Sequence, residues 1–158
     1  MAVDMFLKLD GVKGESQDSK HKGEIEIMSF SWGISQQSAV AHGSGGGAGK
    51  VSVSDFSIVK RIDTASPQLM EAVCQGQHLG SGLITLRKAG ENQLEYLKIK
   101  LTDILISGYQ TSGNSGTGEP AEQVTFSFQN VEVSATEQRA DGKLGDVVTT
   151  SCNFAGKH

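Results

Sequence analysis

The sequence changes its periodicity in one place, residues 51–76, and alternates with a period of two almost everywhere else. Residues 51–62 carry Val, Ile and Phe at alternate positions, which predicts a strand. A helix is predicted to follow, with Ser66 as its N-cap, Pro67 at its first position and Gly76 as its C-terminal stop. Because a helix of about three turns is unstable alone, we expect it to pack on a sheet.

The predicted helix has one apolar face, formed by Leu69, Met70, Val73 and Cys74, since positions three and four residues apart coincide on a helix. Cys74 is therefore expected to be a buried thiol, and Cys152 a second one in a late strand. We expect both to be reduced, as in a cytoplasmic fold, although the sequence leaves a disulfide between them open.

Four predicted strands change the parity of their apolar residues near the middle. They are 24–34, 51–62, 94–109 and 123–134. In the third of them, Leu97, Ile99 and Leu101 share one parity, whereas Ile104 and Ile106 share the other. Long strands that bend around the corners of a barrel bury different faces in each half, which explains the pattern. A second face buried against a neighbouring subunit explains it equally well, and the sequence leaves both open.

Three further strands are predicted, over 3–9, 82–89 and 146–154. The length of 158 residues fits a single domain, 1–158, that buries a full core. We therefore predict a mainly β fold, an antiparallel β-barrel of two sheets with one short α-helix on its side.

The sequence offers little support for catalysis. The glycine-rich segment 43–50 lacks the Gly and the Ser/Thr of a phosphate-binding loop at Ser44 and Val51, and a strand follows it. There is no nucleophile elbow in a strand–turn–helix context, and the histidines are not at metal-ligand spacing. The four histidines are His21, His42, His78 and His158. We expect no enzyme activity, no metal and no cofactor.

Composition excludes several classes of partner. The net charge is −4 with no basic block, which argues against nucleic-acid binding. No apolar run is long enough for a transmembrane helix, so membrane insertion is not expected. The N-terminus alternates like a strand and does not resemble a signal peptide, so any export must use another route.

Several segments together resemble the haemolysin-coregulated protein (Hcp) family of bacterial type VI secretion systems. They are residues 1–9 (MAVDMFLKL), 31–33 (SWG), 45–51 (GGGAGKV), 66–70 (SPQLM) and 84–90 (ITLRKAG). The resemblance runs from residue 1 to about 134 and weakens from Ala135 onward. It is specific because the N-terminal strand, the glycine-rich loop and the capped helix occur together.

The resemblance implies a structural role. In this family, hexameric rings stack into a hollow tube that a contracting sheath expels from the cell, tipped by a spike protein. Small effector proteins travel in the lumen and are protected there. The expected partners are thus further copies of the chain, the spike, sheath and baseplate proteins, and effectors. The chain would be cytoplasmic when made and then secreted to the medium or to a target cell. The alternative is a monomeric β-barrel module that binds a ligand or peptide.

The resemblance also assigns a contact between rings to an extended arm, residues 36–50. The residues expected in this inter-ring contact loop are His42, Gly43, Gly45, Gly46, Gly47, Gly49 and Lys50. Its glycines can adopt left-handed backbone angles that other residues avoid.

Overall fold

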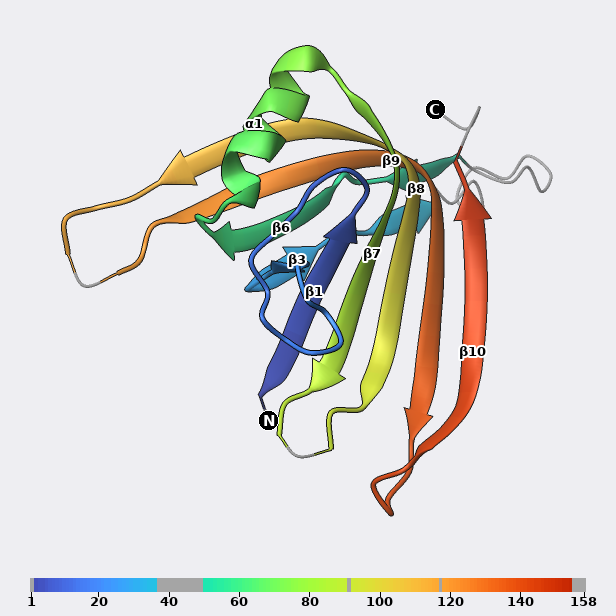
Figure 1. The fold of residues 1–158 in the computed structure, drawn as a ribbon. Helices are drawn as coiled ribbons and strands as arrows, with labels where there is room; N and C mark the ends of the chain where they lie inside the picture. Colours follow the sequence, from blue (N-terminus) through green and yellow to red (C-terminus); the bar gives the residue numbers. More distant parts are fainter. Residues whose placement is uncertain (1, 37–49, 91, 117, 155–158) are drawn as a thin grey trace.

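The structure is a computed structural model that describes residues 2–36, 50–90, 92–116 and 118–154 (Figure 1). Its elements are β1 (Val3–Leu9), β2 (Ile25–Glu26), β3 (Ser29–Ser31), β4 (Ile34–Gln36), β5 (Val51–Val53), β6 (Phe56–Arg61), α1 (Ala65–Gln75), β7 (His78–Lys88), β8 (Glu95–Ser112), β9 (Ala121–Gln138) and β10 (Leu144–Asn153). All paired strands run antiparallel. The mainly β fold with one helix is confirmed.

The two longest strands, β8 and β9, hold the sheet together. They pair with each other from Leu97↔Ala135 to Ser112↔Ala121. The other edge of β9 pairs with β6 along its first half and with β10 along its second half. The sheet therefore splits into two halves, β2-β1-β7-β8-β9-β10 and β8-β9-β6-β3, that share this hairpin. Figure 1 shows β8 and β9 curving sharply between the halves.

One residue of β8, Asp103, marks the bend. Asp103 has a φ of 56°, a left-handed angle that is uncommon outside glycine, and its side chain is exposed. Before it, Ile99 and Leu101 are buried; after it, Ile104 and Ile106 are buried, on the opposite parity. The pairing stays in register across Asp103, with Thr102 opposite Asn130 and Ile104 opposite Phe128, so no residue is inserted there. The left-handed angle at Asp103 accompanies the change of the buried face. The bent-strand explanation of the phase change is thus confirmed for this strand.

The predicted strand 24–34 is in fact three short strands, because the chain changes partner twice. β2 pairs with β1, β3 pairs with β6, and β4 pairs with β5 in a separate two-stranded sheet. Between β2 and β3, the Ile27 N–H donates to Met5 O (3.1 Å) and the Met28 N–H donates to Val59 O (2.7 Å). This crossing joins the two ends of the curled sheet and gives it a barrel shape.

The helix starts two residues earlier than predicted, at Ala65, and turns a different face to the core. Its buried stripe is Ala65, Leu69 and Ala72, whereas Met70 is half exposed and Cys74 is exposed. The predicted burial of Met70 and Cys74 was wrong. Ala65 and Ala72 are small, so the helix packs closely on the sheet through the face that they share with Leu69.

The ends of the helix match the sequence signals in part. Ser66 is not the N-cap: it is buried inside the first turn, and Thr64 at the N-cap position makes no side-chain cap. Pro67 is consequently the third helical residue. Gly76 does end the helix in the left-handed conformation (φ 61°), with its N–H directed to the carbonyls of Ala72 and Val73, as predicted.

The long strands extend beyond their predicted limits. β7 begins at His78, four residues before its predicted start at Gly82, and β9 continues to Gln138, four residues beyond its predicted end at Ser134. Pairing with β8 and β10 holds these polar or glycine-containing segments in strands, which shows that ladder hydrogen bonds override local propensity.

Candidate assembly surfaces

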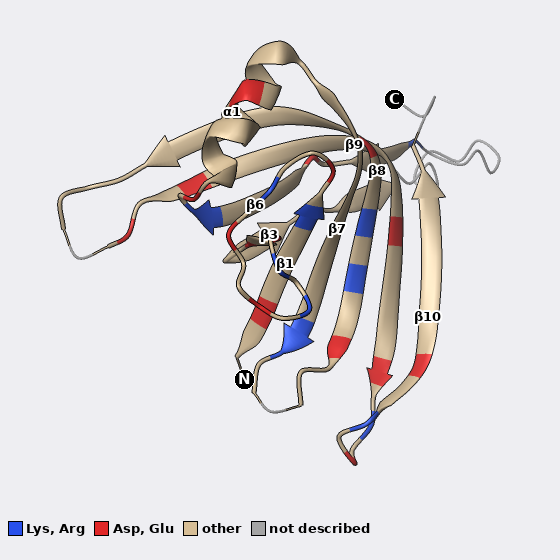
Figure 2. Cartoon of the chain, in the orientation of Figure 1, with Lys and Arg blue, Asp and Glu red and all other residues tan. Residues whose placement is uncertain are grey.

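The last strand is exposed on both faces. Among the described strands, β10 pairs with β9 alone, and Val147 and Val148 are 60% and 72% exposed. Successive side chains of a strand point to opposite faces, so each face of β10 presents one of these valines. Figure 2 shows that β10 carries almost no charge, and Asp146 is its one acidic or basic residue. Soluble proteins usually protect an edge strand with lysines, prolines or a covering segment, so this one has the properties of a contact surface.

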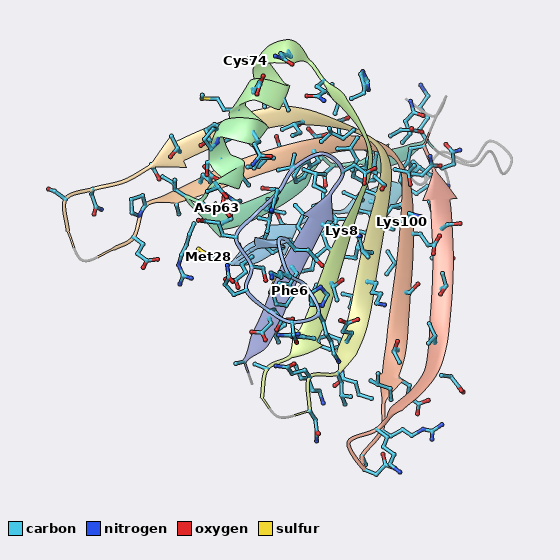
Figure 3. All side chains as sticks on the ribbon, viewed as in Figure 1. Phe6, Lys8, Met28, Asp63, Cys74 and Lys100 are labelled. Carbon is cyan, nitrogen blue, oxygen red and sulfur yellow. The ribbon has the colours of Figure 1, made fainter. Side chains whose placement is uncertain are left out.

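A second apolar surface lies on the other side of the barrel, beside the labels Met28 and Asp63 in Figure 3. Met28, in the crossing between β2 and β3, is 51% exposed, and Ile62, just after β6, is 49% exposed. Both line a groove of about 230 Å³ together with Glu15, Arg61 and Asp63. Both residues lie outside the bounds of the strands, Met28 between β2 and β3 and Ile62 directly after β6.

The arm predicted to contact the next ring is described only at its root. His42, Gly43, Gly45, Gly46, Gly47 and Gly49 lie outside the described residues. Lys50 is described and exposed, directly before β5. The root is the hairpin-like pair β4 and β5, with Ile34 opposite Val53 and Gln36 opposite Val51. Ile34 is exposed there, which adds an apolar side chain to the base of the arm.

A buried ionic network fixes the strand-to-helix corner. Lys60 is fully buried, pairs with Glu122 of β9, and donates to Asp63 Oδ1 (2.8 Å). Ser66 donates to Glu122 Oε1 (2.6 Å), and Tyr109 donates to Glu122 Oε2 (2.5 Å). The network therefore ties α1, β6, β8 and β9 together at one point.

The electrostatics favour an ionised Glu122. Burial raises the pKa of the Glu122 carboxyl, but hydrogen bonds from Lys60, Ser66 and Tyr109 outweigh burial, so the pKa is lowered. Burial and the neighbouring carboxylate raise the pKa of Tyr109 to about 12. Every buried side-chain N or O among the described residues has a hydrogen-bond partner. Sequence reasoning missed this network, although Lys60 and Glu122 fall on the core parity of their strands.

The two thiols are free and both are exposed, Cys74 on α1 and Cys152 on β10. The predicted burial of both was wrong, since the helix turns Cys74 outward and β10 lacks a layer above Cys152. In the described part of the chain, no group of three or more His, Cys, Asp or Glu side chains is arranged to hold a metal ion. Within the same residues, no helix has the length and apolar character needed to cross a membrane.

Comparison with known proteins identifies the family to which this chain belongs. Residues 6–134 match the model of a family described as "Type VI secretion system effector, Hcp". The chain therefore belongs to the Hcp family of type VI secretion proteins.

Individual relatives support this assignment. The protein Hcp1 of Pseudomonas aeruginosa is 48% identical over 143 residues, which is 90% of this chain and 88% of that protein. The crystal structure of Hcp1 from Salmonella typhimurium is 38% identical with a TM-score of 0.84, covering 99% of this chain and 98% of that one. The structure of a type six secretion system protein is 30% identical with a TM-score of 0.92, covering 99% of both chains.

Proposed function

We propose that this chain is the subunit of the inner tube of a type VI secretion system, in which hexameric rings stack into a hollow tube that is expelled from the cell. The observation that carries the proposal, beyond family membership, is the exposure of β10 on both faces with one valine on each. An isolated monomer gains nothing from such an edge, whereas an assembly can cover it.

The ring closes through two different surfaces. β10 with Val147 and Val148 lies on one side of the barrel, and the groove with Met28 and Ile62 lies on the other. Surfaces that differ from each other make head-to-tail contacts, and such contacts form a closed ring when the rotation between subunits closes. We assign β10 and this groove to the faces that meet neighbouring subunits around the ring.

Stacking of rings is assigned to the arm, residues 36–50, by analogy with the family's extended loop. Its root is anchored by the pairing of β4 with β5. The double variant Gly46→Pro/Gly47→Pro should keep single rings but lose most tubes in electron micrographs, because proline removes the backbone freedom of the arm. Tubes as long and as frequent as those of the parent protein would refute this role.

The tube carries small effector proteins in its lumen and works with the spike, sheath and baseplate of the same system. The role is structural, without catalysis or a cofactor, and the chain passes from the cytoplasm to the medium or to a target cell. A direct test measures the chain in culture medium of the native bacterium, with and without the gene of the sheath protein. Release that requires the sheath supports the proposal, and equal release without the sheath contradicts it.

A further inference from the structure

The connection between β1 and β2 forms a strap, residues 13–24, over one face of the sheet. Its own backbone bonds hold it together, from Gly14 N to Gly23 O (2.8 Å) and from Ser16 N to Glu24 O (3.0 Å). Side chains attach it to three other elements. These attachments are Lys13 N and O to the Gln68 amide of α1 (3.0 Å each), Asp18 to Arg87 of β7 (2.9 Å from Oδ2 to Nη1) and His21 to Glu95 of β8 (2.7 Å).

His21 is held between two carboxylates. His21 is 7% exposed, and its ring stacks on Phe6 with the centroids 4.4 Å apart and the planes 9° from parallel. Nδ1 lies 3.0 Å from Glu24 Oε2, and Nε2 lies 2.7 Å from Glu95 Oε1. An ionised carboxylate can only accept hydrogen bonds, so both ring nitrogens must donate. Both contacts can therefore be hydrogen bonds at the same time only when the imidazole carries a proton on each nitrogen.

Other charges face the same site from each neighbouring element. Lys98 of β8 lies 3.5 Å from Glu95, and Arg87 of β7 lies over the Phe6 ring, 4.8 Å from its centroid. Asp4 of β1 accepts a bond from Arg87 Nε (3.3 Å). Lys20 and Lys22 flank His21 in the strap itself. Burial raises the pKa of Glu95, but the hydrogen bond and charge of His21 and the charge of Lys98 outweigh it, so Glu95 stays ionised.

The Asp18 attachment does not titrate near neutral pH. The hydrogen bonds from Arg87 lower the pKa of Asp18 to about 2, and Asp18 in turn raises the pKa of Arg87. Of the two ionic attachments of the strap, only the one through His21 includes a side chain that ordinarily changes charge between about pH 5 and 8.

We propose that His21 is a proton-operated clamp that holds the strap against β8. When His21 loses a proton, one ring nitrogen presents a lone pair to a carboxylate, and the two groups then repel each other. Glu24 is in the strap and moves with His21, whereas Glu95 belongs to β8 and has Lys98 as another partner. The bond between His21 and Glu95 is therefore the one that breaks, and the strap is released from β8 while Asp18 keeps it tethered to Arg87.

The direction of the pH dependence follows from proton linkage. Both contacts need a proton on each ring nitrogen of His21, so we expect the closed strap at low pH and the released strap as the pH rises. Glu15 and Ser16 of the strap line the groove that also holds Met28 and Ile62, so release changes one wall of this groove. The clamp rests on the contacts of the strap alone and does not depend on ring assembly.

Amide hydrogen exchange of the full chain, measured at several pH values, tests the clamp. We expect the protection factors of the Gly14, Ser16 and Gly23 amides to fall at least about tenfold between roughly pH 5 and 8, while amides in the β8–β9 ladder keep theirs. His21→Phe retains a ring to stack on Phe6 but has no proton to lose, so its strap should lose the pH dependence.

Two further variants keep the test decisive if His21→Phe folds poorly. Glu95→Gln removes one of the carboxylates that favour the imidazolium, so the loss of protection should move to lower pH. His78→Gln, at an exposed histidine at the start of β7, should leave the pH profile unchanged. Protection that is constant over this range, or an unchanged profile in Glu95→Gln, would overturn the proposal.

Discussion

Among single residues, the buried pair Lys60–Glu122 matters most for stability. Both side chains are fully buried, so a charge left without its partner has no water to solvate it. Glu122→Gln should lower the free energy of unfolding by about 3 kcal/mol, measured by urea denaturation. Arg61→Ala breaks the neighbouring pair Arg61–Glu119, whose side chains are both largely exposed, and should cost less than about 1 kcal/mol. Equal losses in the two variants would show that the buried network does not stabilise the corner.

Asp18 should make stability sensitive to acid. Hydrogen bonds from Arg87 lower the pKa of Asp18 from 3.8 to about 2 in the folded protein. The stability that Asp18 contributes is therefore complete above its pKa in the unfolded chain and is lost as the pH falls through its pKa in the folded protein. Asp18→Asn should therefore destabilise the protein at pH 7, and its difference from the parent should shrink as the pH falls from about 4 to 2. Unfolding curves at these pH values measure the difference. Glu119→Gln, at an exposed pair, is the control, and a difference for Asp18→Asn that does not vary with pH would contradict the argument.

Which single residues matter was the hardest information to obtain from the sequence. Lys60 lies at a core position of a strand, but parity alone does not reveal that Glu122, 62 residues away, supplies the opposite charge. His21 could be weighed only as a metal ligand, because its two carboxylate partners come from sequence separations of 3 and 74. Pairings of this kind depend on the topology of the sheet, which the sequence does not display.

For the secondary-structure elements, the left-handed conformation of Asp103 marks the bend of β8. Its φ of 56° is strained for a β-branched side chain, although β-branched residues normally favour strands. Asp103→Val should therefore destabilise the protein by about 1–2 kcal/mol, as measured by thermal or urea unfolding. Thr111→Val, in the same strand without a positive φ, should be close to neutral. A neutral Asp103→Val would mean that the bend does not need this conformation.

The existence of most elements was predictable, but their limits were not. Alternation located all the long strands, and Gly76 marked the end of the helix because a left-handed stop leaves a clear signal. The breaks within 24–34 and 51–62 were visible as phase changes, but the cause is a change of partner strand, which is a tertiary event. The wrong helix face has the same origin, since packing against the sheet chose Ala65, Leu69 and Ala72.

For the whole molecule, the edge strand β10 decides whether copies associate. A lysine at Val147 and at Val148 would place a charge on each face of this strand, which opposes burial in a contact. The double variant Val147→Lys/Val148→Lys should fold with a normal circular dichroism spectrum and dissociate at concentrations where the parent remains assembled. Gln75→Lys, at the exposed end of α1, adds a lysine away from both proposed contact surfaces and should assemble like the parent. Assembly of the double variant at parent concentrations would exclude β10 from the ring contact.

The number of copies in solution tests the tube proposal most directly. Gel filtration with light scattering, at several concentrations of the full chain, measures the mass without reference to shape. One subunit is 16.7 kDa, so a ring of six has a mass of about 100 kDa, and we expect a species of that mass that persists on dilution. A mass of 16.7 kDa at every concentration would contradict the ring and would favour a monomeric β-barrel that binds a ligand or peptide.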